Sequence, residues 1–92
     1  MANIKSAKKR IRQNRKRMLR NRMRKNMYRA AVRRFEAAVA TGDVAQAESA
    51  YRFASGRIDR AAQKGAIHRN AGARKKSRLH RILSGMSRAD AS

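Results

Sequence analysis

The chain has 92 residues, with 26 Lys or Arg against five Asp or Glu, a net charge of +21 and a pI near 12. This length suits one small domain. Positive charges this dense repel one another in a compact chain unless a polyanion neutralises them, so we expect a polyanionic partner, with nucleic acid favoured over an anionic membrane. The absence of Cys excludes disulfides and thiolate metal sites and fits a cytoplasmic protein, and no apolar run approaches the ~18 residues of a membrane span.

The charge is concentrated near the start of the chain, where residues 6–26 read SAKKRIRQNRKRMLRNRMRKN. Up to Phe35 there are fifteen basic residues and no acid, whereas eleven basic and five acidic residues follow. The start lacks the apolar stretch of a secretory signal, and its Arg-rich, acid-free character resembles an organelle transit peptide. Against that alternative, the basic pattern continues without a break into a segment with a core face.

A first helix is predicted over residues 6–40, since good helix formers dominate and Pro is absent. Its second half carries a wide apolar stripe, formed by Met27, Tyr28, Ala31, Val32, Phe35, Ala38 and Val39. Its first half has only a narrow seam, formed by Ile4, Ala7, Ile11 and Met18. At ~1.5 Å per residue this helix is ~50 Å long and the next ~30 Å, so ~20 Å should overhang the bundle.

The overhang is expected to be unstable without a partner. Basic pairs such as Lys8/Arg12 and Arg12/Lys16 stand four residues apart, and each like-charge pair costs ~0.2–0.5 kcal/mol in an exposed helix. We therefore expect residues before about Met23 to fray in the free protein at low salt and to become helical on RNA.

Two further helices are predicted over residues 44–64 and 68–86, followed by a frayed tail from 87 to 92. Gly42 suits the end of one helix, Asp43 the N-cap of the next, and Gly65 the second stop. The second helix has an apolar stripe of Val44, Ala47, Ala50, Tyr51, Ala54, Ile58, Ala61 and Ala62, which leaves Phe53 outside. The apolar stripe of the third helix consists of Ala71, Leu79, Ile82, Leu83 and Met86.

The short connections favour antiparallel neighbours. The predicted fold is therefore all-α, an antiparallel three-helix bundle with a long, overhanging basic first helix, in a single RNA-binding domain spanning residues 1–92.

Two basic segments supply the candidate nucleic-acid contacts. Arg offers phosphate a planar donor fork and Lys a mobile charge, while Asn and Gln can reach sugars or base edges. The first segment contributes Asn3, Lys5, Ser6, Lys8, Lys9, Arg10, Arg12, Gln13, Asn14, Arg15, Lys16, Arg17, Arg20, Asn21, Arg22, Arg24 and Lys25. The second, at the start of the third helix, contributes His68, Arg69, Asn70, Arg74, Lys75, Lys76, Ser77 and Arg78. A helix N-terminus there also favours phosphate.

Nothing in the sequence indicates an enzyme. The five acids are scattered, and no Gly-rich phosphate loop is present. His68 and His80 have no nearby Cys or acid, so they suit a helix cap and a solvent-facing position better than a metal site. No cofactor, metal or small-molecule substrate is expected.

Three stretches together resemble a known family. MANIKSAKKRIRQN, RAAVRRFEAAVATGD and AAQKGAIHRNAGARKKSRL, spanning Met1 to about Leu83, resemble the S-twenty family of bacterial small-subunit ribosomal proteins. The resemblance implies direct binding to small-subunit (16S) rRNA, in its 5′ domain and near the base of the long helix of the 3′ minor domain. It implies a monomer within the subunit, with few or no contacts to other ribosomal proteins. The family often has an acid near Arg15, and usually a larger residue at Gly72, so a loose start of the third helix is expected.

Two alternatives stay open at this stage. A DNA-compacting, histone-like protein has the same charge but needs a dimer or a wedge residue, and neither is evident. A membrane-active helix needs a broad apolar face with Trp or Phe, and residues 5–25 offer only a narrow seam.

Overall fold

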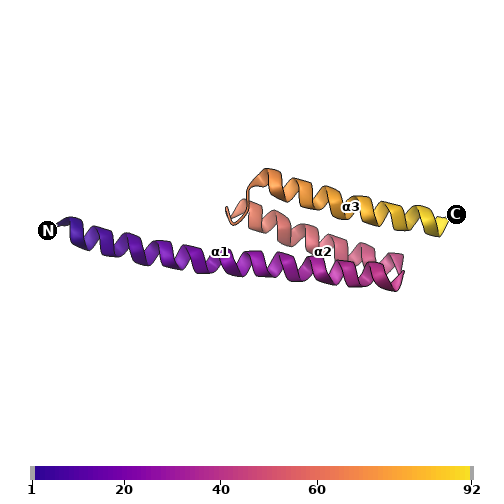
Figure 1. Ribbon diagram of the computed structural model, residues 1–92, viewed down its shortest axis with the longest axis horizontal. Coiled ribbons are helices and arrows are strands. Elements are labelled where there is room, and N and C mark those ends of the chain that lie inside the picture. The colour runs from indigo at the N-terminus through magenta and orange to yellow at the C-terminus, as the bar shows by residue number, and fades with distance from the viewer. Residues whose placement is uncertain (1, 92) are drawn as a thin grey trace.

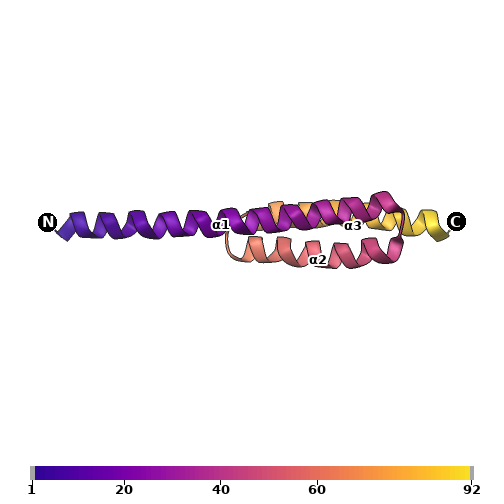
Figure 2. The same ribbon diagram turned by 90° about the horizontal axis from the view of Figure 1, so that it is seen from below.

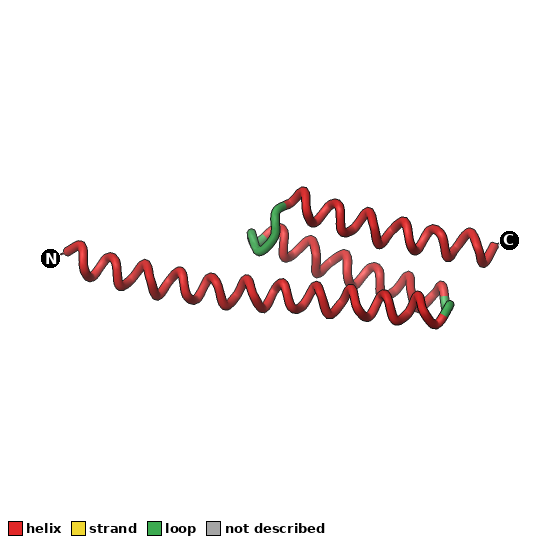
Figure 3. The backbone as a smooth tube through the Cα atoms, in the orientation of Figure 1, coloured by secondary structure: helices red, strands yellow, loops and turns green. Residues whose placement is uncertain are grey.

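In the computed structural model, helices account for almost all of the described chain. The structure describes the backbone of residues 2–91 and the side chains of residues 4–89. Within this part lie α1 (Ala2–Thr41), α2 (Val44–Gln63) and α3 (Arg69–Ala91), which run back and forth along one long axis (Figure 1). Only short loops separate them (Figure 3). The predicted antiparallel three-helix bundle with a long first helix is confirmed.

Two helix ends differ from the sequence prediction by more than one residue. Helix α1 begins at Ala2 rather than near residue 6, and α3 continues to Ala91, so the expected frayed tail from 87 is helical up to that residue. Residues 87–91 contain neither Pro nor Gly, and Gly85 keeps a helical backbone within α3. Nothing therefore interrupts α3 where a stop was predicted. Ser92 lies outside the described residues.

The α1–α2 turn forms as the sequence predicts. Gly42 has φ +80°, and its N–H donates to the carbonyl of Val39 over 3.1 Å. Asp43 is extended, and its Oδ1 accepts the backbone N–H of Gln46 over 3.2 Å as the N-cap of α2. The left-handed residue followed at once by a cap reverses the chain within two residues.

Gly42→Ala is expected to destabilise the bundle by ~1 kcal/mol, because a Cβ penalises the left-handed conformation whatever space is available. Gly56→Ala is the matched control: this helical glycine of α2 has nothing within 4 Å of an added Cβ, so alanine should stabilise by ~0.5–1 kcal/mol. Urea unfolding of both variants measures the two changes. Destabilisation by Gly56→Ala, or none by Gly42→Ala, would contradict this account.

Helix α2 ends in a Schellman motif. Gly65 has φ +77°, its N–H donates to the carbonyl of Ala62 over 3.1 Å, and the N–H of Ala66 donates to that of Ala61 over 2.8 Å. Ala66 and Ala61 are both buried in the core cluster, as suits the apolar positions that flank such a motif. This turn sends the chain back toward α3, as Gly65 predicted.

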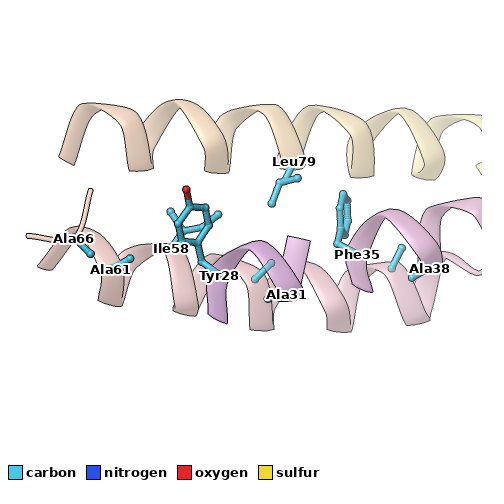
Figure 4. Close-up of a cluster of buried hydrophobic side chains, with 10 residues drawn as sticks. Tyr28, Ala31, Phe35, Ala38, Ile58, Ala61, Ala66 and Leu79 are labelled. Carbon is cyan, nitrogen blue, oxygen red and sulfur yellow. The ribbon is translucent and has the colours of Figure 1, made fainter. Parts of the chain in front are cut away.

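The core is narrow and built largely from alanine. Phe35 of α1 and Ile58 of α2 are its largest fully buried side chains, and Leu79 of α3 is 4% exposed. Figure 4 shows Phe35 and Tyr28 directed toward α3, with Leu79 pointing back between them. The predicted stripes are confirmed at the buried positions Tyr28, Ala31, Phe35, Ala38, Ala47, Ala54, Ile58, Ala61 and Leu79. Met27 and Ile82 are 43% and 40% exposed, so these two predicted core residues lie at its edge.

Helix α2 packs against both of its neighbours and lies between α1 and α3 in Figure 1. The start of α3 is closely packed, which is the opposite of the loose start expected from Gly72. A Cβ at this buried glycine would lie 3.3 Å from Ala62 Cβ and 3.5 Å from Ile58 Cγ2. The small residue therefore allows α3 to approach α2 rather than leaving a gap.

The first half of α1 extends beyond the other two helices (Figure 2). The chain measures 72 × 21 × 13 Å along its principal axes. Helix α1 has 40 residues and α2 has 20, so at ~1.5 Å per residue the overhang is ~30 Å. It exceeds the predicted ~20 Å because α1 begins earlier.

Candidate nucleic-acid interface

The overhang is exposed on all sides. Every described side chain from Ile4 to Arg20 is exposed, including the apolar seam, where Ile11 is 58% and Met18 69% exposed. The predicted site residues with exposed side chains here are Lys5, Ser6, Lys8, Lys9, Arg10, Arg12, Gln13, Asn14, Arg15, Lys16, Arg17, Arg20 and Arg22. Asn21, Arg24 and Lys25 are half-buried, and the side chain of Asn3 lies outside the described residues.

Neighbouring turns of α1 bring the early basic residues together. Lys5, Lys8, Lys9, Arg12, Gln13 and Lys16 line one shallow, open depression on its surface. Near the bundle, Arg24 Nη1 donates to Asn21 Oδ1 over 3.2 Å, so this predicted RNA-contacting amide also holds a neighbouring guanidinium. The result is a rod that presents cations around most of its circumference.

The helical overhang carries several like-charge pairs and no packing partner among described residues, so its stability in the free protein stays a prediction. We expect amide hydrogens before about Met23 to exchange much faster than those of Tyr28–Val39 at low salt, because each exposed like-charge pair opposes the helix. Hydrogen exchange followed by NMR measures this. Equal protection in the two segments would contradict the prediction, and added RNA should slow the exchange.

The described acids all lie in the bundle, and three of them make contacts within the protein itself. Glu48 pairs with Arg52 over 2.8 Å, Asp59 pairs with Lys76 over 2.7 Å, and Asp43 caps α2. None precedes Phe35 in the sequence. The cations of the overhang are therefore not neutralised by acids of their own segment.

His68 caps α3, as its sequence position suggested. Its Nδ1 accepts the backbone N–H of Asn70 over 3.1 Å. An accepting Nδ1 places the ring proton of the neutral imidazole on Nε2, which can then donate to an outside group. His80 is exposed as predicted and also stacks edge-on against Tyr51, with ring centroids 5.8 Å apart.

The rest of the second basic segment divides into two groups. Lys76 bridges α3 to Asp59 of α2, and Lys75 Nζ lies 5.6 Å from the ring centroid of Tyr28 in α1. These two predicted RNA contacts therefore also link the helices. The exposed members Asn70, Arg74, Ser77 and Arg78 recur at helical spacing on the side of α3 away from Leu79, and Arg69 is exposed beside them.

Other kinds of site find no support in the described residues. No group of three or more His, Cys, Asp or Glu could hold a metal ion there. None of the described helices combines the length and apolar character needed to cross a bilayer.

Comparison with known proteins places the chain in a family. The family model described as Ribosomal protein S20 matches residues 2–84. The chain belongs to the ribosomal protein S20 family. It is 51% identical over 87 residues to the small ribosomal subunit protein bS20 of Shouchella clausii, covering 95% of this chain and 99% of that protein. The bS20 proteins of Clostridium novyi and Corynebacterium diphtheriae are 49% and 47% identical, again over 95% of this chain and 99% and 100% of theirs.

Membership in the S20 family makes the chain a structural component of the small ribosomal subunit and not an enzyme. It acts in the cytoplasm as part of the ribosome. The resemblance inferred from the sequence motifs is thereby confirmed.

The structure also brings together basic residues that the sequence analysis left out. Arg57 and Arg60 of α2 line a groove with Arg20 and Arg24 of α1, although more than thirty positions separate the pairs in sequence. Neither belongs to a basic run, so no local signal marked them. Only the antiparallel packing of α1 and α2 creates this cluster.

Proposed function

We propose that this S20-family protein binds 16S rRNA directly, mainly through phosphate contacts, and stabilises the folding and assembly of the small subunit. The observation that carries the proposal is the exposed overhang of α1, which has basic residues on most of its surface and no acid. No acidic side chain of this segment neutralises these cations. A polynucleotide does, since binding releases its condensed counterions.

In this mechanism the bundle acts as a small scaffold that holds the long helix in register. The overhang lies among RNA segments and neutralises phosphates that otherwise repel one another. RNA elements distant in sequence can then pack together. Contacts of this kind position the protein without reading base sequence.

The outward side of α3 supplies a second set of contacts. Asn70, Arg74, Ser77 and Arg78 face away from the core, and His68 can donate from Nε2 beside the start of the helix. The free N–H groups of a helix N-terminus add to the attraction for phosphate. Two separated basic surfaces would let one monomer contact two RNA elements.

The family resemblance points to the 5′ domain of 16S rRNA and to the base of the long helix of the 3′ minor domain as these elements. We propose a single domain that acts as a monomer in the subunit, with few or no protein neighbours. A chemical footprint of the full chain on naked 16S rRNA would locate both contacts. Protection confined to one region would count against the two-surface mechanism.

A competition experiment tests the function as a whole. The full chain is titrated against 16S rRNA, duplex DNA and anionic vesicles at the same moderate salt concentration. We expect preference for rRNA, with a log–log salt dependence at least as steep as that of about six phosphate contacts. Equal affinity for DNA would support a DNA-compacting protein instead, and tighter vesicle binding a membrane-active helix.

A further inference from the structure

A basic groove lies where α2 ends beside α1. Arg20 and Arg24 of α1 and Arg57 and Arg60 of α2 surround the side chains of Met23 and Met27, and the groove encloses about 300 Å³. Its lining comes from α1 and α2 alone, so α3 leaves it open. Its lining combines apolar side chains with four positively charged arginines.

The four guanidinium groups have no acidic partner among the described residues. Arg24 and Arg57 are half-buried: Arg24 donates to the side-chain Oδ1 of Asn21, and Arg57 lies over the ring of Phe53. The nearest acids in the sequence of α2, Glu48 and Asp59, are occupied by Arg52 and Lys76. Folding therefore gathers like charges without compensation, which favours an anion from outside.

An exposed aromatic ring continues the same row. Phe53, the residue that the helical stripe of α2 left unexplained, is 46% exposed. The Arg57 guanidinium carbon lies 5.0 Å from its ring centroid. Phe53, Arg57 and Arg60 follow one another at spacings of four and three, so they share one face of α2. A guanidinium over a phenyl ring forms a flat platform with charge at its edge.

We propose that this α1–α2 groove, together with the adjoining Phe53, binds a short unpaired segment of the rRNA, with its phosphates held by the four arginines and one base stacked on Phe53. The proposal rests on the proposed rRNA-binding function and names one RNA element of it. Bases inside a duplex have their faces covered by neighbours, so an exposed ring selects a loop or bulge. Seven residues separate Phe53 from Arg60, ~10 Å along the helix, which matches about three stacked nucleotides at ~3.4 Å each.

Affinity measurements on full-chain variants test the groove. The probe is in vitro transcribed 16S rRNA of Shouchella clausii, whose bS20 protein is 51% identical to this chain. Phe53→Ala should weaken binding roughly 10-fold, within the range measured for one base–aromatic stack, and Phe53→Trp should retain wild-type affinity. The double variant Arg57→Gln/Arg60→Gln should lower the salt slope by ~1.5, the value for two phosphate contacts on single-stranded RNA. Arg52→Gln, an exposed arginine of the same helix outside the groove, is the control.

Fluorescence supplies a readout that a structural role would not change. The chain contains no Trp, so Phe53→Trp introduces a single reporter. Stacking of a base should quench its emission when 16S rRNA is added. Ile82→Trp on α3, at a position of similar exposure (40%), should show little quenching. Circular dichroism of each variant verifies that the helices form.

Unchanged affinity of Phe53→Ala together with unquenched Phe53→Trp would overturn the proposal. Failure of the groove differs from failure of the proposed function. If only the groove is wrong, neutralising the α1 overhang still weakens rRNA binding. If the function is wrong, the wild-type chain itself shows no preference for rRNA over duplex DNA.

Discussion

Replacing Lys8, Arg12 and Lys16 with glutamine is expected to weaken 16S rRNA binding ~100-fold at ~0.15 M salt. The three side chains lie exposed on one face of the overhang, with no ion pair recorded for them. Each phosphate contact contributes ~0.7–0.9 to the log–log salt slope, so the loss of three should lower the slope by ~2–3. Titrations of the rRNA at several salt concentrations measure both quantities.

The control removes three charges from the bundle instead, through Arg33→Gln, Arg52→Gln and Arg88→Gln. These side chains are also exposed, so the net charge changes equally while the overhang stays intact. We expect a much smaller loss of affinity and a nearly unchanged slope. Equal losses in the two triple variants would show that only total charge matters, and the overhang would then have no special role.

The same overhang substitutions should make α1 more helical in the free protein. They remove the like-charge pairs Lys8/Arg12 and Arg12/Lys16, each of which costs ~0.2–0.5 kcal/mol. Weaker RNA binding is thus expected together with stronger helix signal by circular dichroism. Weaker RNA binding together with higher helix content indicates lost phosphate contacts, whereas a damaged fold would lower both quantities.

Phe35→Ala should lower the melting temperature of the bundle by roughly 15–30 °C. Phe35 is fully buried and meets Tyr51 edge-on, with ring centroids 6.2 Å apart. Truncating a buried Phe costs ~3–5 kcal/mol, and each kcal/mol shifts the transition of a domain this size by ~4–8 °C. The effect is large because most other buried positions are alanine and cannot fill the cavity.

Met18→Ala is the matched control on the same helix. This side chain is 69% exposed on the overhang, so its truncation should leave the melting temperature almost unchanged. Thermal scans by circular dichroism compare the two variants. A similar shift in both would show that the overhang packs on the bundle in solution, which contradicts the exposed rod described above.

Local signals account for the helices, the turns and most of the core. Gly42, Asp43 and Gly65 marked the turns because a left-handed residue and a side-chain cap act within a few positions of the chain. The helix ends at Ala2 and Ala91 were mispredicted, because composition alone contains no stop signal there. Met27 and Ile82 lay on predicted stripes, yet periodicity cannot tell the centre of a contact from its edge.

The candidate interface also has a part that could be predicted from the sequence and a part that could not. The basic overhang was predictable because its charge is contiguous in sequence and needs no partner helix to place it. The contacts that Lys75 and Lys76 make between helices were not predictable, since their partners Tyr28 and Asp59 belong to other helices.

The sequence by itself thus determined the helical class, the turns, the basic first helix and, through its motifs, the S20 family. Only the tertiary structure decided that Gly72 brings α3 close to α2, and that Arg57 and Arg60 complete a groove begun by Arg20 and Arg24. The physical reason is range: capping, propensity and charge density act between near neighbours, whereas a groove between antiparallel helices depends on how two side-chain surfaces fit together.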